Sequence, residues 1–262
     1  MNRKGRRGVK ALKSVRELPD VDVTSAGPVT VAQAERVAQA VGEVLTSHEI
    51  TGGARVRLKT GMCGRGPLVM QVNLSVGELP ARVAAVTAGL DDLSPALERL
   101  DRQIVRMLAP WRPRTWPDPT RRILTVGYDA VVARRKPVVL QRTTPLDAVA
   151  VMDGMDYDAH LFTDSETGED ALVYRAGPSG LRLARQRHVF PPGWAWSPGI
   201  PGPRVPLIVN SRATPTLSEA DAVRRACEHT LPLLFYTDRD TGRGQLLYPR
   251  HDGNLGLLVP TK

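Results

Sequence analysis

The chain contains an internal repeat. The stretch "TDSETGEDALVY", from Thr163 to Tyr174, returns 74 residues later as "TDRDTGRGQLLY", from Thr237 to Tyr248. The same offset holds without a gap beyond these words, since it relates Asp147, Ala148, Val149, Leu181 and Leu183 to Asp221, Ala222, Val223, Leu255 and Leu257. Two copies of this length indicate a duplicated module, because a solenoid needs more and shorter repeats.

Each copy carries the pattern of a small β-α-β-β-β module. In the second copy, an apolar run at 206–212 precedes a helical pattern within 217–229, and three strand-like runs follow at 233–238, 244–250 and 255–260. An Asp- and Gly-containing segment separates two of these runs in both copies, at 164–168 and 238–242. Neither segment continues with the bidentate Glu of a calcium loop. Both therefore predict tight hairpin turns.

The residues before the repeats predict a separate domain in the order β-α-β-β-β-α. Thr30 and Gln33 form a capping box at the start of its first helix. The stretch "ARVRLKT" alternates, so that Val56 and Leu58 share one face of a strand and the bases share the other. These bases are Arg55, Arg57 and Lys59. The fold class predicted for the chain is α+β, with one sheet backed by two helices followed by the two repeated modules.

The second helix of this domain, in "SPALERLDRQIVRMLA", has a basic stripe beside its apolar one. The stripe consists of Arg99, Arg102 and Arg106, spaced i, i+3 and i+7. Such a stripe is often a solvated face. Together with the strand bases, however, it gives one small domain two basic features, which we expect to grip a phosphate backbone.

The positive charge is concentrated in two segments. The net charge is +9, and residues 1–16 carry seven Lys or Arg and no acid, while residues 111–136 carry seven against Asp118 and Asp129. A basic segment of this kind releases counterions from a polyanion, so nucleic acid is the expected partner. A solubilising tail is the alternative. The sequence shows no signal peptide or membrane span, and two Cys with no metal-like spacing suit a reducing, cytoplasmic compartment.

Composition divides the chain further. Segments rich in Pro, Arg, Trp and Gly predict linkers, in which Trp111 and Trp116 either stack on bases or dock on a neighbouring domain. The predicted boundaries are a basic tail at 1–18, the N-terminal domain at 19–110, a linker at 111–128, module copy one at 129–184, a second linker at 185–206 and module copy two at 207–262.

No catalytic, cofactor or metal site is predicted. The five His residues form no zinc-binding pair, and the chain has neither a nucleophile elbow nor a Cys-His signature. The glycines of "GMCGRG", at 61–66, lack the strand and helix that flank a nucleotide-binding loop, so a hairpin loop is expected.

The C-terminal residues resemble a known family, the long-form ribosome hibernation promoting factors, also called sigma-54 modulation proteins. The stretch "YPRHDGNLGLLVP", from Tyr248 to Pro260, is similar to the end of that family's C-terminal module, and "IVNSRATPTLSEADAV", "LLFYTD" and "DTG" precede it in the family's order. The N-terminal domain matches in element order and in "LERLDRQIVRM". The second module is unusual, and it resembles actinobacterial, hypoxia-linked and dormancy-associated members, which the excess of Arg over Lys also suits.

This resemblance implies a non-enzymatic inhibitor of translation that responds to stress. It would bind the 70S ribosome through the 30S subunit and 16S rRNA, with its N-terminal domain in the decoding channel, and need no cofactor. The candidate rRNA contacts are Arg3, Lys4, Arg6, Arg7, Arg55, Arg57, Lys59, Arg99, Arg102 and Arg106. The family's first helix is usually basic, whereas here Arg36 is nearly its only base. The alternative is a transcriptional modulator that binds DNA or polymerase, and a small-molecule enzyme is a more distant one.

The duplication predicts how the modules pair. In the family this module joins two chains, whereas two copies on one chain are able to pair with each other. We expect the copies to meet through Leu161, Phe162, Leu233, Leu234, Phe235 and Tyr236, leaving ribosomes as single 70S particles rather than 100S pairs. In the alternative, copy two dimerises between chains and copy one is a spacer.

Overall fold

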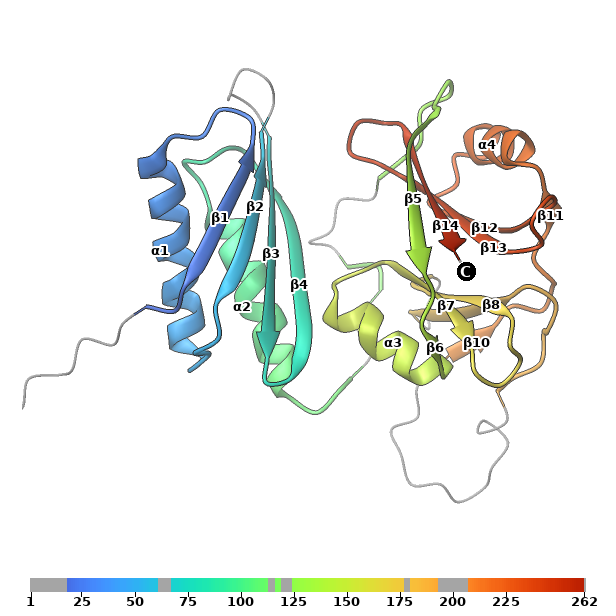
Figure 1. Cartoon of the computed structure of the whole chain (residues 1–262), viewed down its shortest axis with the longest axis horizontal. Coiled ribbons are helices and arrows are strands. Elements are labelled where there is room, and N and C mark those ends of the chain that lie inside the picture. The colour runs from blue at the N-terminus through green and yellow to red at the C-terminus, as the bar shows by residue number, and fades with distance from the viewer. Residues whose placement is uncertain are drawn as a thin grey trace, which may run out of the picture. The chain divides into compact units, whose positions relative to one another are not determined.

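The described residues form two compact units that divide after Leu108. The computed structural model (Figure 1) describes residues 18–60, 67–112, 116–118, 124–176, 180–192 and 207–261. Helices and sheets occur in both units, so the predicted α+β class is confirmed.

The first unit is one sheet with two helices on one of its faces (Figure 1). Its elements are β1 (Val21–Ala26), α1 (Val31–Ser47), β2 (Ala54–Lys59), β3 (Leu68–Val76), β4 (Leu79–Thr87) and α2 (Ser94–Leu108). The strands lie in the order β1-β2-β3-β4, in which only β1 and β2 are parallel. The predicted capping box begins α1, since the Gln33 N–H donates to Thr30 Oγ1 and the Thr30 N–H donates to Gln33 Oε1.

Alternation along the strands decides which face of this sheet the helices cover. Val56 and Leu58 are buried against apolar residues of both helices, including Val41 and Leu100. Successive strand residues point to opposite faces, so every second residue of β2 lies on the face without helices. The predicted alternation of β2 is confirmed, because Arg55, Arg57 and Lys59 are exposed.

The second unit contains both repeats, and each element of the second copy starts 74 residues or so after its counterpart. The elements are β5 (Val132–Val139), β6 (Arg142–Thr143), α3 (Pro145–Gly154), β7 (Ala159–Asp164), β8 (Asp170–Tyr174), β9 (Leu181–Arg185), β10 (Leu207–Val209), β11 (Thr216–Leu217), α4 (Glu219–Glu228), β12 (Leu234–Asp238), β13 (Gly244–Pro249) and β14 (Leu255–Thr261). The two predicted tight turns join antiparallel strands and use Gly168 and Gly242 at positive φ. They are hairpin turns, as expected.

The two copies exchange their first strands. One sheet has the order β10-β9-β8-β7-β6, so that β10 of copy two lies beside β9 of copy one. The other has the order β11-β12-β13-β14-β5, so that β5 of copy one lies beside β14 of copy two. Both exchanged pairs are parallel. The sequence pattern places each first strand in its own copy, and similar repeats leave no local signal that distinguishes the two arrangements.

The predicted linker at 111–128 is packed at both described ends. The Trp111 indole lies against the apolar core of copy one, and its Nε1 donates to Asp153 Oδ2 at 2.8 Å. Val126 is buried in the core of copy two, with Ala130 just beyond the linker. Of the two alternatives for Trp111, the structure therefore shows docking on a neighbouring domain.

Gly256, on the strand that pairs with β5, gives a test of how closely the Tyr248 ring packs on β14. Gly256 on β14 is aligned with Tyr248 on one side and Arg134 of β5 on the other, and a Cβ at Gly256 would lie 2.3 Å from Tyr248 Cζ. We expect Gly256→Ala to lower the unfolding free energy in urea by about 1–3 kcal/mol, because the aromatic ring must shift. Gly127→Ala is the control, since its added Cβ meets nothing closer than 3.5 Å. Equal stability of the two variants would contradict this packing.

Candidate nucleic-acid interface

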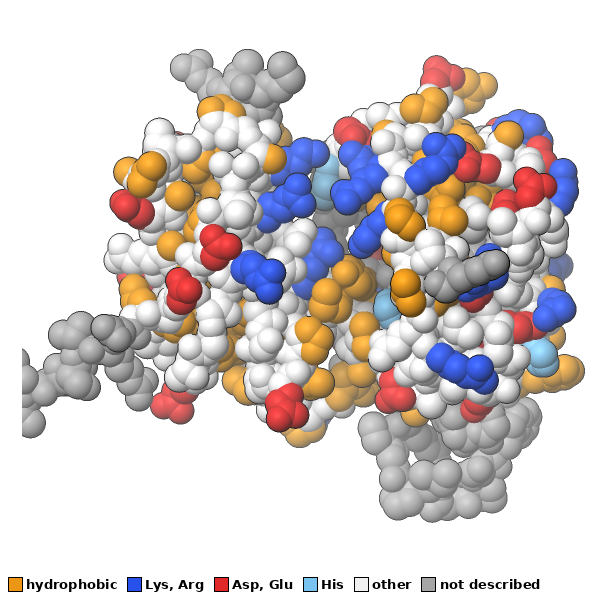
Figure 2. Space-filling model, viewed as in Figure 1, with side chains coloured by type: hydrophobic (Ala, Val, Ile, Leu, Met, Phe, Trp, Pro, Cys, Tyr) orange, Lys and Arg blue, Asp and Glu red, His pale blue; other side chains and the backbone are white. Residues whose placement is uncertain are grey.

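The open face of the first sheet carries a row of cations. Arg55, Arg57 and Lys59 project from β2, and strand register places Asn73 beside Arg55 and Gln71 beside Arg57. Amide groups can donate to phosphate oxygens as the cations do. Figure 2 shows Lys and Arg side chains over the strands of the first unit.

A fourth cation on this face, Arg82, is absent from the sequence-based candidates. It lies on β4, where Ala81 and Val83 are buried beneath the helices, so Arg82 points to the open face. Register aligns it with Asn73, which is itself aligned with Arg55. The alternation of "LPARVAAVT" is sufficient to place Arg82 on the face opposite to Ala81 and Val83 from the sequence. We call Arg55, Arg57, Lys59 and Arg82 the sheet-face cations.

The only acid aligned with these four on the described part of the sheet is Asp22, opposite Arg55 on β1. Polar side chains lie beside Arg55 and Arg57, where Thr24 donates to the Val56 carbonyl at 3.3 Å and Gln71 Nε2 donates to Asn73 Oδ1 at 3.2 Å, whereas the apolar Val69 lies beside Lys59. Such a surface favours phosphate groups over apolar ligands. A row of cations and amides suits recognition of shape and of the phosphate backbone.

The arginine stripe of α2 lies on the other side of the sheet. Arg99, Arg102 and Arg106 project from the helix whose apolar stripe packs beneath the strands, and Arg102 pairs with Glu98 at 3.4 Å. Asp101 faces α1, where His48 Nε2 contacts it at 2.7 Å. Arg99 and Arg106 lie nearly opposite Asp101 around the helix, and so on the flank directed away from α1.

The strand bases and the helix bases therefore do not share one face of this unit, and contact of each set with a phosphate backbone stays a prediction. The physical reason is the layer order, since a helix packed on one face of a sheet cannot bring its outer side to the other face. The first unit instead has two separate basic surfaces. Arg3, Lys4, Arg6 and Arg7 lie outside the described residues, as does the loop at 61–66.

The residues predicted for module pairing divide into two groups. Leu161 and Phe235 belong to one apolar cluster with Leu172, Ala184 and Leu246, and Leu233 packs against it. This cluster, which we call the inter-repeat core, contains side chains from both copies. Phe162 instead lies in the core of copy one, and Leu234 and Tyr236 lie in the core of copy two. Alternation explains the division, because neighbouring strand residues face opposite sides of each sheet.

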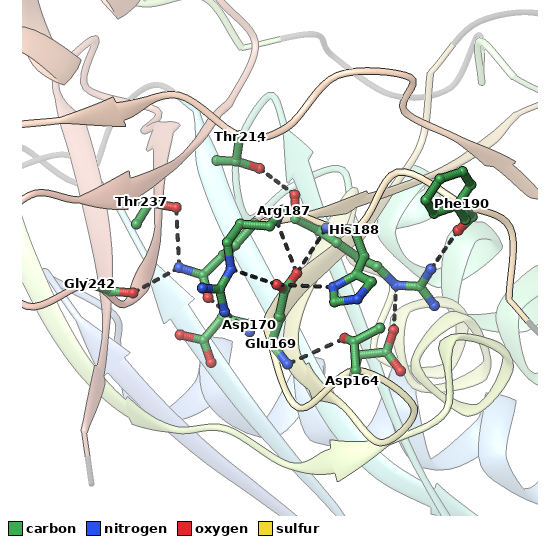
Figure 3. Close-up of polar contacts among 12 residues, drawn as sticks. Asp164, Glu169, Asp170, Arg187, His188, Phe190, Thr214, Thr237 and Gly242 are labelled. Carbon is green, nitrogen blue, oxygen red and sulfur yellow. Dashed lines mark hydrogen bonds and ion pairs between the residues drawn. The ribbon is translucent and has the colours of Figure 1, made fainter.

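A buried carboxylate holds the chain where it leaves copy one (Figure 3). Glu169 is 4% exposed and accepts hydrogen bonds from the backbone N–H groups of Arg187 and His188, at 3.0 and 3.1 Å, and from Arg187 Nε at 2.8 Å. Burial acts to raise the pKa of Glu169, but these hydrogen bonds outweigh it and lower the pKa to about 2. Beside it, Arg185 pairs with Asp164 at 2.5 Å and donates to the Phe190 carbonyl.

Within the described ranges, no three His, Cys, Asp or Glu side chains gather as a metal site would require. Among the helices that the structure describes, none combines the length and apolarity needed to cross a membrane.

Two comparisons relate the chain to known proteins. The family model described as the C terminus of Sigma 54 modulation/S30EA ribosomal protein matches residues 128–183, which is copy one. Two curated relatives, from the CDC 1551/Oshkosh and H37Rv strains of Mycobacterium tuberculosis, bear the name dormancy associated translation inhibitor. Each is 66% identical to this chain over 246 residues, which cover 94% of this chain and 90% of the relative.

The sheet-face cations make a prediction for polyanion binding. We expect Arg55→Gln with Arg57→Gln and Lys59→Gln to weaken RNA binding and to flatten its salt dependence. The slope of log affinity against log salt should fall by roughly 2 to 3, at about 0.7 to 0.9 for each phosphate that the protein no longer neutralises. Filter binding or fluorescence anisotropy from 50 to 200 mM salt measures it.

The control for this triple variant removes the same charge elsewhere. Arg212→Gln with Arg225→Gln and Arg239→Gln changes three exposed arginines of the second unit. Equal salt slopes for the two triple variants would show that the sheet face has no special part in binding.

The lowered pKa of Glu169 predicts how the stability of the protein depends on pH. Its pKa is lowered from 4.5 in the folded state, so its stabilising contribution is complete above about pH 4.5 and is lost as pH falls toward 2. We expect Glu169→Gln to be less stable than the wild type at pH 7, with a difference that shrinks between pH 4.5 and 2. Urea unfolding at several pH values measures this, and a difference independent of pH would contradict the assignment.

Proposed function

Because the chain belongs to the long-form hibernation promoting factor family, we propose that it is a ribosome hibernation factor that inhibits translation under stress. The observation that carries this proposal is 66% identity over 94% of the chain to proteins named dormancy associated translation inhibitor. The family model matched in copy one supports the same assignment. Nothing in the comparisons supports the alternative of a DNA- or polymerase-binding transcriptional modulator.

The first unit acts by occupancy rather than by catalysis. It binds the small-subunit channel between head and body, where it overlaps the positions of mRNA and tRNA. The sheet-face cations contact 16S rRNA phosphates there, with the polar amides of Gln71 and Asn73 between them. Contacts of this kind depend on rRNA shape and backbone.

The α2 arginines form the second contact surface of this unit. A domain inserted into a channel meets rRNA on more than one side, and the two basic surfaces lie on opposite sides of the sheet layer. We expect each surface to contact a different rRNA segment, so that losses from the two surfaces add in free energy.

The second unit pairs its own two modules within one chain. The inter-repeat core draws apolar side chains from both copies, and each sheet includes a strand from the other copy. A parallel strand pair needs a connection of a dozen or more residues. The stretch from Arg185 to Leu207 exceeds this, so β10 can return to β9 of the same chain. Pairing within a chain also has an effective concentration in the millimolar range.

A factor whose modules are already paired leaves ribosomes as single 70S particles. Free modules, in contrast, would join two factor-bound ribosomes into a 100S pair. The alternative, in which copy two dimerises between chains, would leave copy one as a spacer and would not need the exchanged strand β5.

The test is a sucrose gradient of purified ribosomes with near-stoichiometric factor. We expect the factor to sediment with 70S particles, to reduce translation in a reconstituted extract, and to produce no 100S peak. The variant Arg55→Gln with Arg57→Gln and Lys59→Gln should lose most of both effects. A dominant 100S peak would contradict pairing within the chain, and failure to sediment with ribosomes at low salt would contradict the function itself.

A further inference from the structure

Two equivalent positions of the repeats touch each other across the inter-repeat interface. Asp170 and Gly244 are related by the 74-residue offset, and the Gly244 N–H donates to Asp170 Oδ2 at 2.8 Å. Arg243 donates to the same carboxylate from Nε at 2.7 Å and from Nη2 at 3.2 Å. Equivalent positions that touch must lie at the approximate two-fold axis of the pair.

At such an axis, the residue type decides which copies are able to pair. Two modules of the copy-one type would place Asp170 against a second Asp170, with Glu169 where Arg243 now lies. Asp170 is 4% exposed, so the two carboxylates would repel each other in a site with little water. Two modules of the copy-two type would leave Arg243 without this carboxylate.

Steric fit restricts the same position. A Cβ at Gly244 would lie 2.7 Å from Asp170 Cβ and 2.8 Å from Phe235 Cε2. Copy two therefore needs glycine here, since both the aspartate of copy one and its own Phe235 occupy the space. In copy one the residue equivalent to Phe235 is the smaller Leu161, and Asp170 is accommodated.

In the inter-repeat core, as at Gly244 and Asp170, small side chains of one copy pack with larger side chains of the other. Three of its four equivalent pairs differ in size, namely Leu161 and Phe235, Ala159 and Leu233, and Ala184 and Leu258, while Leu172 and Leu246 are identical. In each of the three unequal pairs, copy one has the smaller side chain. Two copies of type two would crowd this core and two of type one would leave voids, and both changes destabilise packed interiors.

A further contact between the copies has no counterpart in the opposite direction, because only copy one has the donor. Gln186 Nε2 donates to Thr237 Oγ1 at 3.1 Å and to the Gly242 carbonyl at 2.8 Å (Figure 3). The position equivalent to Gln186 in copy two is Pro260, whose side chain has no donor. The interface thus has the topology of a symmetric dimer but the chemistry of two different partners.

We propose that the two modules are specific for each other, so that copy one binds copy two and neither binds a module of its own type. Asp170, Arg243 and Gly244 are the residues that determine this choice. The inference deepens the proposed function, on which it rests for the pairing of modules within a chain. Its consequence is that a second chain cannot be joined through like modules, because discrimination requires a penalty for the wrong pair as well as contacts in the right one.

The test compares three variants of the full chain by sedimentation velocity from about 1 to 100 μM. Asp170→Gly removes the contacts of the correct pair and also the repulsion that blocks pairing of copy one with copy one. We expect concentration-dependent dimers, with self-association on the order of tenfold or more above the wild type. Gly244→Asp places an aspartate on both sides of every pair, so we expect a monomer with an increased hydrodynamic radius. Asp240→Gly changes an exposed carboxylate of the neighbouring turn and should match the wild type.

A shape-preserving cycle covers the case in which a glycine variant does not fold. Asp170→Asn and Arg243→Gln should each lower the urea midpoint, and the double variant should lower it by less than the sum of the two. Additive midpoints, or an Asp170→Gly chain that stays as monomeric as Asp240→Gly, would overturn the proposal while leaving pairing within the chain intact.

A wild-type chain that is dimeric at these concentrations would contradict pairing within the chain. It would not contradict the specificity of copy one for copy two. Two chains can pair copy one with copy two reciprocally. In that case Asp170→Gly should form assemblies larger than the dimer, and an unchanged dimer would overturn the specificity proposal.

Discussion

The second unit depends on parallel pairing between the first strand of each repeat and the last strand of the other. β5 is aligned with β14 over most of its length, and β10 is aligned with β9. Neither sheet is complete without a strand from the other copy, so the two modules fold as one body. The inter-repeat core then lies between two sheets whose edges are already tied together.

In the first unit, the arrangement of side chains depends on which face of the sheet the helices cover. Its two helices cover one face of a four-stranded sheet, and the buried apolar residues of the strands lie on that side. The other face is left to residues of the opposite alternation, which include the sheet-face cations. A single layer of helices thus leaves a basic surface on a domain, residues 17–110, in which eleven acids outnumber nine bases. The local arrangement of charge on this unit therefore matters more for attraction of a polyanion than its net charge does.

Much of this arrangement is readable from the sequence because it depends on local patterns. Alternation in "ARVRLKT" located the exposed bases, and the 74-residue offset located both hairpin turns and both helices of the repeats. The same alternation applied to "LPARVAAVT" would have added Arg82. Strand exchange was not readable, because the two repeats are similar and no local pattern in the first strand of each copy shows which copy it joins. The separation of the α2 arginines from the strand bases was missed for a related reason, since periodicity shows which residues share a face of one element but not how faces of two elements are layered.

Pairing of the modules within one chain is the central claim, and mixing labelled chains tests it most directly. Equal amounts of ¹⁴N- and ¹⁵N-labelled full-length protein are unfolded together, refolded at low micromolar concentration and analysed by native mass spectrometry. Pairing within the chain predicts two monomer masses and no species of intermediate label. A mixed ¹⁴N/¹⁵N dimer in the proportion expected for random association would contradict it.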